Sequence, residues 1–121
     1  MFTKHKYLGT PEYDTTCERL KVLARQGKPT GYNLIFEIMK LPLGNYAAKE
    51  AGHMLGEISE QMHLAGKPML SALVINQRDR MPGSGFFELA VHLGKLQAGA
   101  SDQEKTAFWE KELAAVYATK W

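Results

Sequence analysis

The segment from residue 45 to residue 66 carries the side chains best suited to contact a nucleic acid. Lys49 and His53 are four positions apart, so a helix would place both on one face. Asn45 and Tyr46 precede them, at the end of the helix that would enter a groove first. Cationic side chains bind phosphate oxygens and asparagine pairs with base edges. The spacing predicts a helix that contacts DNA through its first half, with a solvated helix face as the alternative.

Three glutamates on the same segment, Glu50, Glu57 and Glu60, would repel phosphate unless they are turned away from it. Glu57 and Glu60 are also the candidates for a small hydrolase or nuclease that depends on a divalent metal ion. Acids three apart on a surface helix are usually solvated charge, and the sequence shows no partner acid for them. We therefore interpret them as solvated and expect no catalytic residue.

The metal-binding residue types are scattered. The histidines show no His-x-x-x-His pair and are His5, His53, His63 and His92. The single cysteine, Cys17, cannot form an internal disulfide and has no histidine beside it, which favours a reducing compartment. We predict no metal site and no cofactor.

A polar segment from residue 76 to residue 84 contains two cations around an acid, Arg78, Asp79 and Arg80, followed by Pro82-Gly83. Proline and glycine mark it as a loop. Two cations flanking a turn suit a wing that touches the DNA backbone, and an exposed loop partly neutralised by Asp79 is the alternative.

Periodicity and capping residues predict five helices around this loop. They run from Pro11 to Gln26, from a Thr30 cap to a stop at Pro42, from an Asn45 cap to Gly66, from Gly85 to Gly94, and from a Ser101–Glu104 capping box onward. The third helix would turn inward Ala48, Ala51, Gly52, Leu55, Ile58 and Met62. The apolar run Met69–Ile75 predicts a buried strand. The fold class is α+β and mostly helical, with a helix-turn-helix or winged-helix-like core, a short strand or hairpin and a C-terminal helix.

Three pieces of the chain follow one another in an order known from a DNA repair family. They are Thr30-Gly31-Tyr32, Ala47-Ala48-Lys49-Glu50-Ala51-Gly52 and Ser71-Ala72-Leu73-Val74-Ile75-Asn76. This order resembles the winged-helix domain of the DNA alkyltransferase and alkyltransferase-like family. That family has a Thr-Tyr-Gly helix, an Ala-Ala-Arg-x-x-Gly recognition helix and a strand holding Pro-Cys-His-Arg-Val or Pro-Trp-His-Arg-Val. The resemblance covers about half the chain.

The resemblance implies a DNA-binding role for specific residues. Lys49 would stand where the family's intercalating arginine stands, Tyr32 would lie near the DNA backbone, and Ser71 would take the methyl-acceptor position in the pocket. The family's reactive Cys-His-Arg has become Ser71-Ala72-Leu73, and a serine without a neighbouring base is inert. The implied function is therefore a non-catalytic DNA-binding protein.

Composition limits the remaining possibilities. The chain has 121 residues with 45% hydrophobic and 23% charged residues, which fits one folded domain over residues 1–121. Its net charge of +2 means that DNA affinity must come from local clusters. No apolar run approaches the roughly 20 residues that span a bilayer, and the first residues lack an apolar signal core. We expect a cytoplasmic protein without membrane contact.

An alternative class is a small protein-binding module, such as an adaptor, an inhibitor or a mobile-element accessory protein. It would act through exposed aromatic residues of the last helix, of which Trp109, Tyr117 and Trp121 are the candidates. Large aromatic side chains often anchor protein interfaces. They can equally pack the last helix onto the others, and the sequence leaves both possibilities open.

Overall fold

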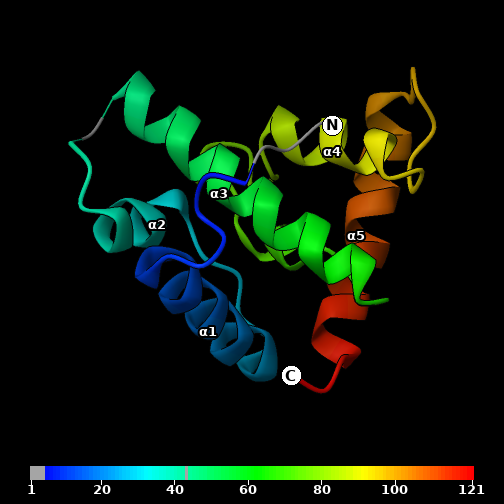
Figure 1. Ribbon diagram of the computed structural model, residues 1–121. Helices are drawn as coiled ribbons and strands as arrows, with labels where there is room; N and C mark the ends of the chain where they lie inside the picture. Colours follow the sequence, from blue (N-terminus) through cyan, green and yellow to red (C-terminus); the bar gives the residue numbers. More distant parts are fainter. Residues whose placement is uncertain (1–4, 43) are drawn as a thin grey trace.

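The computed structural model describes residues 5–42 and 44–121, and in them the chain is mostly helical (Figure 1). In this view α3 runs diagonally across the molecule, with α1 and α2 on one side and α4 and α5 on the other. The elements are α1 (Pro11–Gln26), α2 (Tyr32–Met39), α3 (Asn45–Leu64), the short 3-10 helix η1 (Leu70–Leu73), α4 (Ser84–His92) and α5 (Asp102–Ala118).

Helix α1 has the bounds that its end signals predict. The Thr10 side chain accepts a hydrogen bond from the Tyr13 amide, and Pro11 occupies the first turn, where its missing N–H costs nothing. Gly27 ends the helix in the left-handed conformation, with φ of 67°, which glycine adopts without a steric penalty. The helix buries Cys17 and Leu20 in the core.

The predicted caps of the next two helices are wrong by one residue. Gly31, not Thr30, precedes α2, and Gly44, not Asn45, precedes α3, and neither supplies a side-chain cap. The Thr30 backbone is used elsewhere: its amide donates to the Leu73 carbonyl at 2.8 Å and its carbonyl accepts from the Ile75 amide at 2.9 Å. This pairing holds Thr30 in an extended conformation before the helix. The cap position of α2 therefore falls on the next residue, Gly31.

The buried apolar run after α3 does not form the predicted strand. Leu70–Leu73 is a 3-10 helix, and the only β-type pairing in the described residues is one isolated parallel bridge between Thr30 and Val74. The prediction of burial was correct, since residues 69–75 are all buried. A strand needs a neighbour along its length, and helices α1, α3 and α5 surround this run instead. The described chain therefore shows the helical part of the predicted α+β class without its strand.

Helix α4 begins one residue earlier than predicted, at Ser84, and brings two aromatic rings into the core. Phe86 and Phe87 are buried, with their ring centroids 5.1 Å apart in an edge-to-face arrangement. This geometry is the favourable one for adjacent aromatic rings. The rings thus anchor α4 and fix the position of its first turn.

Helix α5 begins with the predicted capping box. The Ser101 hydroxyl accepts from the Glu104 amide at 3.1 Å, and the Glu104 carboxylate accepts from the Ser101 amide at 2.9 Å. We expect Ser101→Ala to lower the free energy of unfolding by about 1 kcal/mol, because one helix amide loses its acceptor. Urea denaturation of the variant measures this, and an unchanged midpoint would show that the cap contributes nothing.

One hydrophobic cluster joins α1, α2, α3, η1, α4 and α5. Its centre is η1, where Leu70, Ala72 and Leu73 have no exposed surface. Aromatic and aliphatic side chains of α5 pack against this cluster, and the Trp109 indole N–H donates to the Ala72 carbonyl at 2.9 Å. No helix in the described ranges is both long enough and apolar enough to cross a membrane.

Candidate functional site

Helix α3 has three different faces, and the predicted inward face is partly wrong. The core face holds Ala51, Met54, Leu55 and Ile58, all buried. Ala48 and Gly52, predicted to point inward with them, are exposed. Compared with the prediction, α3 is rotated about its own axis, because a second face, which carries its glutamates, is also covered.

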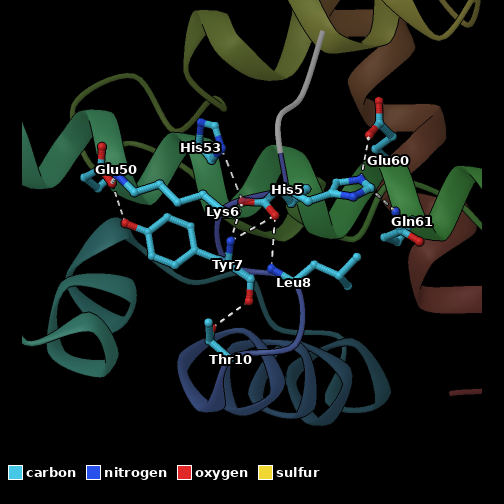
Figure 2. Close-up of polar contacts among 10 residues, drawn as sticks. His5, Lys6, Tyr7, Leu8, Thr10, Glu50, His53, Glu60 and Gln61 are labelled. Atoms are coloured by element: carbon cyan, nitrogen blue, oxygen red, sulfur yellow. Dashed lines mark hydrogen bonds and ion pairs between the residues drawn. The ribbon is translucent and has the colours of Figure 1, made fainter. Parts of the chain in front are cut away.

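That second face lies under residues 5–8, which we call the N-terminal segment (Figures 1 and 2). The Glu57 carboxylate has no exposed surface and accepts hydrogen bonds from the backbone amides of Tyr7 and Leu8, each at 3.0 Å. The His53 Nε2 lies 3.3 Å from the same carboxylate. Glu57 is therefore the main attachment point of the segment.

Two further glutamates on this face hold side chains of the N-terminal segment (Figure 2). Glu50 accepts hydrogen bonds from the Lys6 ammonium and the Tyr7 hydroxyl, and it is buried. Glu60, also buried, has its carboxylate 3.8 Å from the His5 Nε2. The interpretation of Glu57 and Glu60 as solvated is thus wrong, because the chain folds back over them.

The pairing of Lys6 with Glu50 links attachment of the segment to pH. The hydrogen bond to Lys6, followed by that to Tyr7, holds the pKa of Glu50 below its ordinary 4.5, and the hydrogen bond to Glu50 raises the pKa of Lys6 above 10.5. A lowered carboxyl pKa stabilises the folded state above pH 4.5, and this contribution is lost as the pH falls through the lowered value. A raised ammonium pKa contributes below pH 10.5 and is lost at higher pH. The Lys6–Glu50 pair therefore stabilises attachment of the segment throughout the neutral pH range.

The third face of α3 borders a groove of about 580 Å³ toward α4. It is lined from α3 by Ala48, Lys49, Gly52, His53, Leu55 and Gly56, and from the other side by the first turn of α4, Asn76, Tyr32 and Ser71. In the described part of the chain Lys49 has no ion-pair partner. Glu88 on α4 is the one acidic residue in the lining. Small residues on α3 leave the groove open between its charged groups.

Four of the residues predicted for a site line this groove together: Tyr32, Lys49, His53 and Ser71. The Tyr32 hydroxyl accepts from the Gly83 amide at 3.2 Å, which fixes the ring beside the start of α4, and burial raises the pKa of this tyrosine. Ser71 is buried, and its hydroxyl hydrogen-bonds the Ser59 hydroxyl at 2.6 Å. The sequence pieces behind the family resemblance thus meet in one place.

The other predicted contact residues lie outside the groove lining. Asn45 and Tyr46 are exposed at the start of α3, and Tyr46 retains 61% of its surface. Arg78 and Arg80 are exposed in the predicted loop. Arg80 has a left-handed backbone, with φ of 56°, and borders a separate hollow with the Thr30 region.

The aromatic residues of the alternative protein-binding hypothesis are partly buried against the core. The Trp121 indole N–H donates to the Val116 carbonyl at 2.8 Å, and Arg25 donates to the Trp121 carbonyl. Cys17 is buried, and burial raises the pKa of its thiol to about 11. Within the described residues no three histidine, cysteine or acidic side chains come together in a way that could hold a metal ion.

Comparison of the chain with protein-family models, with curated proteins and with solved structures gives no match.

Sequence reasoning missed the N-terminal segment and its three glutamate partners. Tyr7 and Glu57 are 50 positions apart, and no local pattern connects them. A possible signal was the density of acids on one side of α3 together with Lys6 and His5 near the start of the chain. Opposite charges of this kind become informative only when the path of the chain is known.

Proposed function

We propose that the chain is a non-catalytic DNA-binding protein whose contact surface is the groove face of α3 with the flanking 76–83 loop. Helices α2 and α3 would act as the helix-turn-helix pair and the loop as the wing, as the resemblance to the alkyltransferase-like winged-helix domain implies. Lys49 would bind phosphate, with His53, Asn45 and Tyr46 beside it.

The observation that carries the proposal is that the N-terminal segment covers the acids of α3. All three glutamates that would repel phosphate lie on the covered face, where Glu50 and Glu57 are held by the N-terminal segment. Lys49 is exposed in the lining of the open groove. A helix with three acids can approach DNA only if its acids are neutralised or covered. The arrangement meets that requirement.

The loop supports the same surface with two more cations. Asn76 and Gly83, at the two ends of the loop, line the groove, and Arg78 and Arg80 are exposed in the loop between them. The Asp79 carboxylate accepts from the Met81 amide at 3.1 Å, which orders the turn between them. Exposed arginines in a loop that flanks the groove suit contacts with the sugar-phosphate backbone.

The test is the affinity of a labelled DNA duplex for the Lys49→Glu variant, measured by fluorescence anisotropy at low and physiological salt. We expect binding to weaken roughly tenfold and the slope of log affinity against log salt to decrease by about one unit, as for loss of one phosphate contact. Glu88→Gln is expected to strengthen binding, because it removes the acid from the groove.

Lys111→Glu is the matched control, since it makes the same charge change at an exposed position of α5 outside the groove. Equal losses in the two variants would mean that only net charge matters and would contradict the proposed surface. Absence of duplex binding by the unmodified protein at low salt would reject DNA binding and favour the protein-binding alternative. A duplex containing alkylated guanine, run in parallel, tests whether the Ser71 side of the groove distinguishes a modified base.

A further inference from the structure

The N-terminal segment is attached to α3 mainly by polar contacts. Tyr7 lies at the margin of the hydrophobic cluster, and the Leu8 side chain is 42% exposed. The segment is held by two backbone amides on Glu57, by Lys6 and the Tyr7 hydroxyl on Glu50, and by His5 beside Glu60. Segments with few buried apolar contacts open locally at a lower free energy than the core.

The chain next to the segment permits such opening. Gly9 follows it with φ of +89°, a left-handed turn that separates the segment from α1. The cap of α1 is local, because the Thr10 hydroxyl accepts from the Tyr13 amide. Thr10 also donates to the Tyr7 carbonyl, through its amide at 2.9 Å and its hydroxyl at 2.6 Å. Release therefore breaks the contacts of residues 5–8 and leaves α1 capped.

We infer that the N-terminal segment is a releasable cover whose attachment sets the charge that α3 presents beside the groove. This control of binding rests on the proposed function. When the segment is attached, Glu50 and Glu60 face Lys6 and His5, and Glu57 is satisfied by backbone amides. When it is released, three carboxylates become solvated and lose these partners.

The released carboxylates are close enough to Lys49 to oppose phosphate binding. Glu50 follows Lys49 directly in sequence. Glu57 lies eight residues after Lys49, which is roughly 12 Å along the axis of α3. The screening length is about 8 Å at physiological ionic strength and about 30 Å at 0.01 M. Release of the segment is thus expected to weaken DNA binding, most strongly at low salt.

A charge-neutral pair of variants tests the cover. Leu8→Pro removes the amide that donates to Glu57, and Leu8→Ala removes the same exposed side chain while keeping that amide. Hydrogen exchange of the 121-residue chain, followed by NMR, reports the protection of the Tyr7 amide and, as an internal reference, of the Ile58 amide in α3. We expect at least roughly tenfold less protection at Tyr7 in Leu8→Pro, an unchanged Ile58, and no change in Leu8→Ala.

DNA affinity of the same variants tests the consequence for the groove. Leu8→Pro should bind a duplex at least about threefold more weakly at low salt, and adding Glu57→Gln should restore part of the affinity by removing one uncovered charge. Tyr7→Phe, which loses only the hydroxyl contact to Glu50, gives a second, milder release if the proline variant does not fold.

The two readouts separate failure of the cover from failure of the proposed function. Tyr7 protection equal to that of Ile58 in the unmodified protein, or unchanged in Leu8→Pro and Tyr7→Phe, would overturn the cover. Loss of Tyr7 protection together with unchanged DNA affinity would overturn the inference that the segment controls binding at the groove. If the unmodified protein does not bind DNA, the proposed function and this control fail together, and the exchange result still decides whether the segment is releasable.

Discussion

Replacing Glu112 by alanine is expected to lower the free energy of unfolding by about 2–4 kcal/mol. The Glu112 carboxylate on α5 is buried and accepts a hydrogen bond from the Met69 amide at 2.7 Å, as well as one from the Lys95 ammonium. With alanine at position 112, the buried amide of Met69 loses its hydrogen-bond acceptor. Met69 is the residue directly before η1. The Lys95 side chain is 22% exposed. Water can therefore hydrate its ammonium group and offset part of the interaction lost with Glu112.

Urea denaturation measures this effect, and two further variants apportion it. Glu110→Ala removes an exposed acid from the same helix and should stay within about 0.5 kcal/mol of the unmodified protein. Glu112→Gln keeps an oxygen acceptor for Met69 and should cost less than alanine. A loss below about 1 kcal/mol in Glu112→Ala would show that the Met69 amide finds another partner, and that η1 is not fixed through α5.

Replacing Leu73 by alanine is expected to destabilise the protein by about 2–5 kcal/mol, because it deletes buried methyl groups and leaves a cavity. Leu73 has no exposed surface and belongs to η1, which contacts α1, α3 and α5. The loss should appear as a lower denaturation midpoint with an unchanged slope, as for a protein that unfolds in the same cooperative step.

Leu64→Ala is the control for this prediction. It makes the same chemical change at the end of α3, where the side chain is 71% exposed, and should alter stability by less than about 0.5 kcal/mol. Similar losses at both positions would contradict the placement of η1 at the centre of the core. A strand at residues 69–75, the sequence-based expectation, would also bury Leu73, so this experiment tests the core and not the type of secondary structure.

The ends of elements show where local sequence was sufficient. Helix α1 begins at Pro11 and ends before Gly27, and α5 begins after Ser101, because these residues satisfy helix ends through contacts within the same turn. The caps of α2 and α3 were misplaced for the opposite reason. Thr30 makes its backbone pairs with Leu73 and Ile75, more than 40 positions away, and these contacts decide its conformation.

The candidate site was predictable in part. Lys49 and His53 fall on one helix face by spacing alone, and both line the groove as one set with Tyr32 and Ser71. That Tyr32 and Ser71 reach the same groove depends on how α2 and η1 pack on α3, which no periodicity encodes. Arg78 and Arg80 were correctly expected in an exposed loop, and their role in binding stays a prediction.

By itself the sequence determined what depends on neighbouring residues: five helices, the ends of α1, the capping box of α5 and the burial of residues 69–75. The tertiary structure alone decided that this run forms a 3-10 helix, because whether a strand can pair depends on distant neighbours. It also decided which charged side chains of α3 are exposed to solvent. Glu50, Glu57 and Glu60 look solvated when α3 is considered in isolation, and they are buried because a segment about 50 residues earlier folds back over them.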